Sequence, residues 1–131
     1  AAIAAAVMNE VQQGDHVICI KSPYSWTNYL LNTLLVKYGV TTTMIDGTKV
    51  ENFEAAIQEN TKLFFLETPN SMTFELQDLE VVSKLAKSKN ITTVCDNSYS
   101  TPLCQNPADY GIDIIVHSAS KYLSVHNYLV A

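Results

Sequence analysis

The stretch Ile112–Tyr122 reads IDIIVHSASKY, a short apolar run that leads directly into a cluster of polar side chains. Isoleucine and valine without strict alternation are typical of a strand that is buried on both faces of a parallel sheet. The run therefore predicts a strand at Ile112–His117. Because ligands of open α/β sheets bind beyond the carboxyl ends of the strands, the polar residues that follow are site candidates: Ser118, Ser120 and Lys121.

The same alternation of apolar runs and amphipathic stretches continues along the whole chain. Four further runs predict strands at His16–Ile20, Thr41–Ile45, Lys62–Glu67 and Ile91–Asp96. Patterns of helical period predict helices at Ala1–Gln12, Tyr24–Tyr38, Val50–Asn60 and Leu76–Lys89. Strands that alternate with helices of this length need crossover connections, so we expect one α/β domain with a mostly parallel sheet flanked by helices.

Composition and charge exclude several classes of protein. The chain has 131 residues, of which 47% are hydrophobic, so it can bury a single core and is not disordered. Its net charge of -5 argues against a nucleic-acid surface, which would need clustered lysine and arginine. No apolar run reaches the roughly 18 residues of a membrane span. We expect neither a nucleic-acid nor a membrane partner.

The cysteines and histidines give no sign of a metal site or of a disulfide framework. Cys19, Cys95 and Cys104 are odd in number and lack the C-x-x-C spacing, and the histidines lack H-E-x-x-H spacing. Cys19 and Cys95 lie within apolar runs, which predicts buried, reduced thiols and a cytoplasmic protein. Asp78 and Glu80 open a predicted helix and are interpreted as acids that complement its dipole.

Lys121 is the most informative of the residues at the strand ends. A lysine beside an apolar strand end loses part of its hydration, which favours the neutral amine that Schiff-base chemistry requires. The alternative is an ordinary surface lysine at the start of a loop. Ser118 and Ser120 could both donate to phosphate oxygens, or they could be ordinary turn residues.

Two more residues at strand ends have a functional and a structural interpretation. Asp96 follows the buried run Thr93–Cys95, and a carboxylate there needs a partner. That partner is either the backbone of the next turn or a ring nitrogen that must stay protonated. Tyr24 follows the first strand, where it is either a core or surface aromatic or a ring on which a flat ligand stacks.

In this order, the segments resemble one family, the Cys/Met-metabolism pyridoxal-phosphate enzymes. The matching residues are Tyr24, Glu67-Thr68-Pro69, Asp96-Asn97-Ser98-Tyr99, Ser100-Thr101-Pro102 and Val116-His117-Ser118-Ala119-Ser120-Lys121-Tyr122. The family includes cystathionine gamma-synthase, the cystathionine lyases and methionine gamma-lyase. The resemblance runs over essentially the whole chain and implies an aspartate aminotransferase-like, fold type I domain.

The resemblance also implies a cofactor, pyridoxal 5′-phosphate, and a role for each matching residue. Lys121 would form the Schiff base with the cofactor and then move protons at the alpha and beta carbons of the substrate. Asp96 would pair with the pyridinium nitrogen, and Ser118 and Ser120 would hold the phosphate. Tyr24 would stack on the ring and is a candidate to activate the substrate amine.

Three segments depart from the family pattern. The family usually reads E-[TS]-P-x-N-P, and Ser71 stands at the asparagine expected near the phenolic oxygen of the cofactor. Asn70, one place earlier, replaces it only if the loop shifts. Trp26 stands where glycine is common and methionine gamma-lyases carry a cysteine, which disfavours that activity. After the lysine, Ser124-Val125 replaces two glycines.

The resemblance places residues 1–131 in the central part of the cofactor-binding, or large, domain. The N-terminal arm and the C-terminal small domain of the family would lie outside them. We expect a homodimer or homotetramer that eliminates or replaces a group at the beta or gamma carbon of cysteine, a homoserine ester, cystathionine or methionine. The alternatives are a catalytically degenerate paralogue with a regulatory role and another fold type I enzyme, such as an aminotransferase.

Overall fold

The apolar runs of the chain form the strands of one sheet. The structure is a computed structural model that describes residues 1–123. Every side chain of the first strand is buried, as are all but one in the third, so both faces of the sheet must be covered. The strands are β1 (His16–Ile20), β2 (Thr41–Ile45), β3 (Thr61–Glu67), β4 (Thr92–Asp96) and β5 (Ile114–Val116).

The strands lie in the order β2-β1-β3-β4-β5, and every pair is parallel. β1 and β3 are neighbours in the sheet although β2 lies between them in sequence, so the direction of winding reverses there. This order is one of the common doubly wound arrangements, in which ligands bind beside the point of reversal. The predicted fold class, a mostly parallel sheet flanked by helices, is confirmed.

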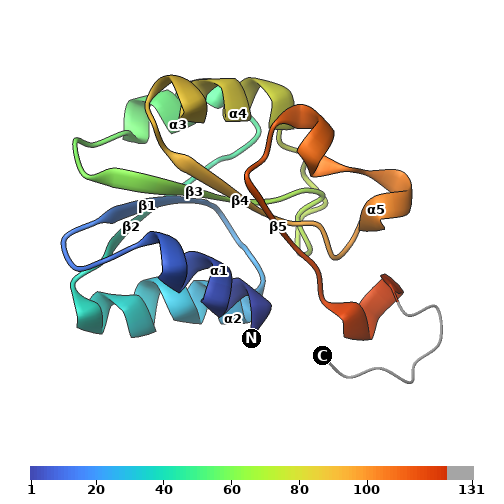
Figure 1. Cartoon of the computed structure of the whole chain (residues 1–131), viewed down its shortest axis with the longest axis horizontal. Helices are drawn as coiled ribbons and strands as arrows, with labels where there is room; N and C mark the ends of the chain where they lie inside the picture. The colour runs from blue at the N-terminus through green and yellow to red at the C-terminus, as the bar shows by residue number, and fades with distance from the viewer. Residues whose placement is uncertain (124–131) are drawn as a thin grey trace.

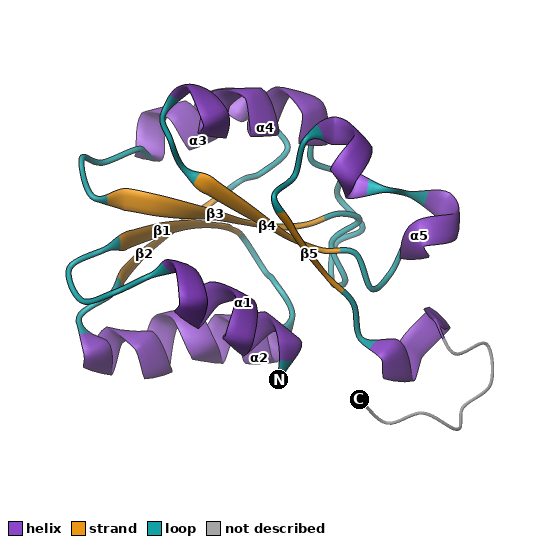
Figure 2. Cartoon of the chain, in the orientation of Figure 1, coloured by secondary structure: helices purple, strands orange, loops and turns teal. Residues whose placement is uncertain are grey.

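Helices cover both faces of the sheet (Figures 1 and 2). α1 and α2 lie on one face, and α3 and α4 lie on the other. The α-helices are α1 (Ala2–Glu10), α2 (Ser25–Tyr29), α3 (Val50–Ala56), α4 (Leu79–Ser88) and α5 (Thr101–Cys104). The segments with π or 3-10 geometry are η1 (Leu30–Leu34), η2 (Leu35–Tyr38), η3 (Pro107–Tyr110) and η4 (Ala119–Leu123).

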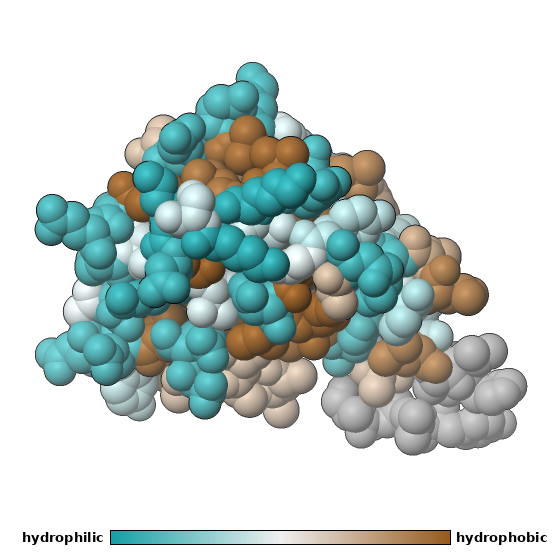
Figure 3. All heavy atoms as spheres, turned by 45° about the horizontal axis from the view of Figure 1, so that its top comes forward, coloured by the Kyte–Doolittle hydropathy of each residue, from teal (hydrophilic) through white to brown (hydrophobic). Residues whose placement is uncertain are grey.

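The hydrophobic core has two layers, one on each face of the sheet. Val7 of α1 and Leu31 of η1 pack with Phe65 of β3 in one layer. Phe53 of α3 and Val82 of α4 belong to the other. Successive residues of β3 alternate between the layers, as side chains of a strand must. In Figure 3, hydrophilic residues predominate on the face that turns α3 and α4 toward the viewer.

The predicted elements are found, with differences at their ends. Each predicted strand end lies within two residues of the observed one. The helix expected at Tyr24–Tyr38 is a helical run that changes from α to π to 3-10 geometry and stops at Gly39, where φ is 78°. The helix expected to reach Asn60 ends at Ala56, and the short α5 and η3 were not predicted.

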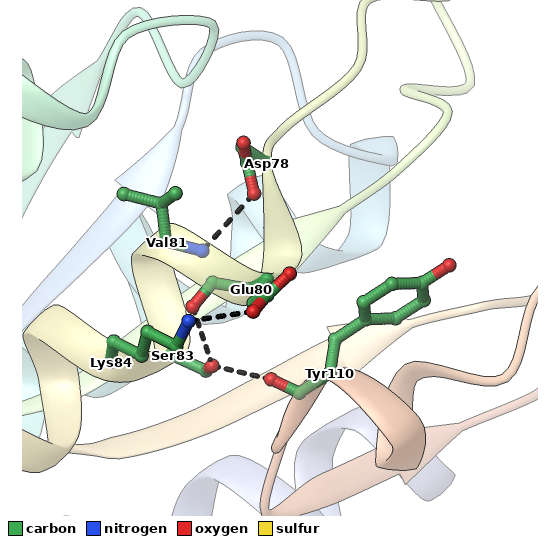
Figure 4. A network of polar contacts seen from close by, with 6 residues as sticks. All are labelled: Asp78, Glu80, Val81, Ser83, Lys84 and Tyr110. Atoms are coloured by element: carbon green, nitrogen blue, oxygen red, sulfur yellow. Dashed lines mark hydrogen bonds and ion pairs between the residues drawn. The ribbon is translucent and has the colours of Figure 1, made fainter.

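The start of α4 agrees with the interpretation of its acids (Figure 4). Asp78 is the N-cap, and its Oδ1 accepts a hydrogen bond of 3.0 Å from the Val81 amide. Glu80 lies in the first turn and forms an exposed ion pair of 2.6 Å with Lys84. The Ser83 hydroxyl donates to the Tyr110 carbonyl, which ties α4 to the end of η3.

Candidate functional site

The carboxyl ends of all five strands meet at one edge of the sheet. The register pairs Ile20 with Ile45, Glu67 with Asp96, and Asp96 with Val116. Because paired residues of parallel strands lie level with one another, the predicted site residues that follow these strands are carried to the same edge. Glu67 and Asp96 also bring two carboxylates onto adjacent strands there.

Asp96 is half-buried at the end of β4. Its Oδ1 accepts a hydrogen bond of 2.9 Å from the Ser98 amide. Within residues 1–123 the carboxylate makes no further hydrogen bond, so its second oxygen remains available. Val94, two residues earlier on β4, packs in the same core layer as Val7 of α1. Asp96 therefore lies on the sheet face that α1 covers.

A run of hydrogen bonds joins Asp96 to the residues after β5. The Ser98 hydroxyl accepts from the Ser118 amide at 2.7 Å, and the Ser118 and Ser120 hydroxyls are 3.0 Å apart. The Lys121 amide donates to the Ser118 carbonyl at 3.0 Å. The structure thus brings together Asp96, both predicted serines and the backbone of Lys121.

Lys121 differs from the expectation in one respect. Its side chain is exposed. Residues 1–123 therefore do not provide the shielding from water that was expected beside the apolar strand end. Its backbone has φ of -98° and ψ of -118°, which interrupts the helical geometry of η4 at this residue.

Tyr24 and Ser71 form a second group, held by Glu67. The Tyr24 amide donates to Glu67 Oε2 at 2.8 Å, and the Ser71 amide donates to Glu67 Oε1 at 2.7 Å. The Tyr24 ring is 41% exposed and Ser71 is also exposed, so both side chains remain accessible. Within residues 1–123, no side-chain hydrogen bond joins Tyr24, Glu67 or Ser71 directly to Asp96 or the serines, but Glu67 and Asp96 are register partners on neighbouring strands.

Asn70 does not take the place of the expected asparagine at position 71. Its side chain is buried, and its Nδ2 donates to the carbonyls of Lys21 and Ser22. Its Oδ1 accepts from the amides of Met72 and Thr73, at 2.9 Å each. Both ends of the Asn70 amide are therefore occupied within the protein.

His117 directly follows β5. Its Nδ1 is buried and has no partner among residues 1–123.

The sequence pattern also gave no role to Glu67, Ser98 or Gln105, although each connects two segments of the edge. Gln105 Nε2 donates to the Thr68 carbonyl and to Asn97 Oδ1, at 2.8 Å each. Burial of a carboxylate at a strand end is the signal that could have identified Glu67.

The cysteines agree with the prediction of reduced thiols. Cys19 and Cys95 are buried and free, and Cys104 is free and exposed. Burial raises the pKa of Cys95 to about 12, with a smaller contribution from the charge of Asp96. Burial likewise raises the pKa of Cys19 well above its usual value. The two buried thiols are therefore protonated at neutral pH and unreactive.

Comparison with known proteins assigns the family. The model of a family described as Cys/Met metabolism PLP-dependent enzyme matches residues 1–131. This chain belongs to that family. The family prediction, and with it the predictions of an enzyme family and of pyridoxal phosphate as its cofactor, is confirmed. None of the helices within residues 1–123 has the length and apolar character needed to cross a membrane.

The relatives are enzymes of methionine and cystathionine metabolism. L-methionine gamma-lyase of Fusobacterium nucleatum is 37% identical over 131 residues, which are 99% of this chain and 33% of that protein. Cystathionine beta-lyase MetC of Bacillus subtilis is 37% identical over 117 residues, which are 89% of this chain and 30% of that protein. The chain thus spans about a third of the length of the curated relatives it matches.

A solved structure of the family has the same fold. The structure of cystathionine gamma-lyase from Lactobacillus plantarum, complexed with L-serine, has a TM-score of 0.94 at 34% identity. The match covers 98% of this chain and 34% of that one. The parallel sheet and its flanking helices are therefore those of the family's fold type I domain.

The chemistry of the edge fits pyridoxal phosphate. Asp96 has a carboxylate oxygen to spare for a protonated ring nitrogen. Ser118 and Ser120 share one hydrogen between their hydroxyls, so the second hydroxyl hydrogen is free for a phosphate oxygen. Lys121 directly follows Ser120 in sequence, and its side chain is accessible.

Proposed function

We propose that the full-length protein is a pyridoxal-phosphate enzyme that eliminates or replaces a group at the beta or gamma carbon of sulfur amino acids. It acts as a C–S lyase or as a cystathionine gamma-synthase. The observation that carries this proposal is the run of hydrogen bonds from Asp96 through Ser98 to Ser118, which gathers a carboxylate, hydroxyls and an accessible amine at one edge.

Asp96, Ser118 and Ser120 hold the cofactor in this proposal. The Ser98 amide fixes one oxygen of Asp96, so the other oxygen presents a charge to the ring nitrogen without having to reorient. The two hydroxyls bind the phosphate, and the Ser98 hydroxyl fixes the backbone from which they project. Pyridoxal phosphate, when bound, supplies an electron sink for negative charge at the alpha carbon of the substrate.

Lys121 and Tyr24 are the candidate catalytic residues. Lys121 would hold the cofactor covalently through its amine. Once the substrate amine has displaced it, the freed Lys121 amine would accept the alpha proton and return a proton at the beta or gamma carbon. Tyr24 packs its accessible ring on the cofactor and takes a proton from the substrate amine. Ser71 lies in the loop after β3, where its hydroxyl contacts the cofactor at the position the family gives to asparagine.

The substrate is cysteine, a homoserine ester, cystathionine or methionine. The names of the relatives, a methionine gamma-lyase and a cystathionine beta-lyase, support this class. Residues 1–131 form the central part of the cofactor-binding domain of a homodimer or homotetramer, as the one-third coverage of those relatives suggests. Three free cysteines, two of them buried, support a cytoplasmic location for the protein.

The test uses the full-length protein incubated with pyridoxal phosphate. We expect a visible absorption band from the lysine-bound cofactor, and borohydride reduction should leave the cofactor's mass on the peptide that contains Lys121. An elimination should release ammonia and a keto acid from at least one of the four substrates, and a replacement should form cystathionine from a homoserine ester and cysteine. Absence of the band, or a band that persists in Lys121→Ala, overturns the proposal. A stoichiometric pyridoxamine product favours an aminotransferase instead.

A catalytically degenerate paralogue is the second candidate, favoured by the segment after β3. Ser71 replaces the expected asparagine, and the buried Asn70 is committed to the loop around it. In that case the full-length protein binds pyridoxal phosphate through Lys121 but releases neither ammonia nor keto acid and forms no cystathionine from a homoserine ester and cysteine. Sustained turnover of any of the four substrates excludes this candidate.

A further inference from the structure

Glu67 connects two loops of the carboxyl edge that are far apart in sequence. It is the last residue of β3, and its side chain is only 4% exposed. One carboxylate oxygen accepts from the Tyr24 amide at 2.8 Å, and the other accepts from the Ser71 amide at 2.7 Å. Each oxygen thus holds one loop, and each loop carries a residue of the proposed site.

The loop that leads to Tyr24 depends on these contacts for its shape. Ser22 has φ of 53°, in the left-handed region that a non-glycine residue seldom adopts. Asn70 Nδ2 donates to the carbonyls of Ser22 and Lys21, at 3.0 and 3.3 Å. Two buried side chains of the β3 loop, Glu67 and Asn70, therefore hold the backbone just before the Tyr24 ring.

We propose that Glu67 is a positioning residue. It fixes the Tyr24 ring at the edge of the sheet where the cofactor binds and holds that ring at a constant position relative to Ser71. This inference rests on the proposed function for the role of Tyr24 in catalysis, but its structural part does not. A carboxylate is needed because it accepts two hydrogen bonds with both oxygens. Glutamine offers one acceptor and turns an NH2 group toward the other amide, so one of the two loops must be released.

The experiment compares Glu67→Gln, Tyr24→Ala and the double variant in the full-length protein with pyridoxal phosphate. Asp113→Asn is the matched control. Asp113 also accepts two hydrogen bonds, from the amide and hydroxyl of Thr93, but both reach its Oδ2, so asparagine can keep them while losing the charge. It lies at the opposite end of the strands. Fluorotyrosine at position 24 reports the environment of the ring by fluorine NMR, both with and without cofactor.

We expect Glu67→Gln to shift or broaden the fluorine signal in both forms and to lower kcat by about tenfold or more, the worth of one hydrogen bond to a charged group. Asp113→Asn should change neither. In the Tyr24→Ala background, Glu67→Gln should cause little further loss of kcat, because its effect passes through Tyr24. An unchanged fluorine signal, or losses that multiply in the double variant, overturns the inference.

Asn70→Asp provides a second route if Glu67→Gln does not fold. Aspartate keeps the oxygen that accepts from Met72 and Thr73 but loses the NH2 group that donates to Lys21 and Ser22. It should move the same fluorine signal, and an unchanged signal counts against the inference. Failure of the proposed function is distinct, because it appears as missing cofactor binding or turnover in the unaltered protein.

Discussion

The two ends of the sheet use polar side chains in different ways. At the amino end, the buried His16 has both ring nitrogens 2.8 Å from threonine hydroxyls, of Thr61 and Thr43. At the carboxyl end, Asp96 has one oxygen bonded, and the hydroxyls of Ser118 and Ser120 are joined by one hydrogen bond, which leaves one hydroxyl hydrogen free. The His16 ring at the amino end is satisfied within the chain, whereas Asp96 and the two serines at the carboxyl end keep capacity for another molecule.

This difference separates residues that stabilise the fold from residues that serve a ligand. Buried polar groups that find all their partners inside the protein contribute to stability and specify one packing. Groups that keep unused hydrogen-bonding capacity gain little for the fold and are typical of binding sites. Substitutions at the amino end should therefore change stability, and substitutions at the carboxyl end should change cofactor binding and activity.

The largest effect is expected for Lys121→Ala. The side chain is exposed, so the free energy of unfolding should change by less than about 0.5 kcal/mol. Loss of the group that transfers protons should lower kcat by about 10²–10⁴-fold. Urea denaturation and steady-state kinetics of the full-length protein measure the two quantities. A loss of stability in parallel with the loss of activity would place Lys121 with the structural residues instead.

A smaller effect on activity is expected for Asp96→Asn. Asparagine keeps the oxygen that accepts from the Ser98 amide, so the local turn should persist. The negative charge is lost, and a hydrogen bond to a charged group is worth about 1.5–3 kcal/mol, so affinity for pyridoxal phosphate should fall about tenfold to a hundredfold. Titration with the cofactor measures this, with Asp113→Asn as the control at the other end. Equal affinity of the two variants would contradict the assignment.

The fold could be predicted from the sequence because its signal is local. The runs around Ile18 and Phe64 are apolar without interruption, and both residues are fully buried. Uninterrupted runs of this kind, separated by helical patterns, allow few arrangements other than a covered parallel sheet. Helix ends were predicted less well, because the end at Ala56 and the π segment after Tyr29 depend on packing rather than on composition.

The site could be predicted only as a set of strand ends. The rule for parallel sheets brings Asp96 and Ser118 to one edge without any knowledge of their contacts. The roles of Glu67 and Ser98 were missed because they depend on bonds across 43 and 20 residues of sequence. The unpartnered Nδ1 of His117 was missed for the same reason, since sequence does not reveal which neighbours surround a ring.

A test of the amino end uses pH. Burial lowers the pKa of His16 below its usual value of 6.5, so the folded protein binds its proton less tightly than the unfolded chain does. The unfolded state then holds more protons below about pH 6.5, and stability should decrease as the pH falls through that value. His16→Gln should lose this part of the pH dependence, with turnover per folded molecule unchanged. Urea denaturation between about pH 7.5 and about pH 5.5 compares the variants, around the ordinary titration range of histidine.

An unchanged slope in His16→Gln would show that another group causes the loss of stability at low pH.

The smallest effect is expected for Ser71→Asn, which sharpens the comparison at the carboxyl end. Ser71 is exposed and contributes only its amide to Glu67, so asparagine should leave stability unchanged. If this position faces the cofactor, the added amide should raise cofactor affinity by at most about tenfold, the value of one hydrogen bond. Met72→Asn is the control, since Met72 is a neighbouring side chain that is 69% exposed. A gain in Ser71→Asn alone identifies a position that contacts the ligand, because a general effect of surface polarity would appear in both variants. Equal cofactor affinities of Ser71→Asn and the unaltered protein would mean that the Ser71 side chain has no contact with the cofactor. The replacement of asparagine by Ser71 would then no longer support a degenerate paralogue.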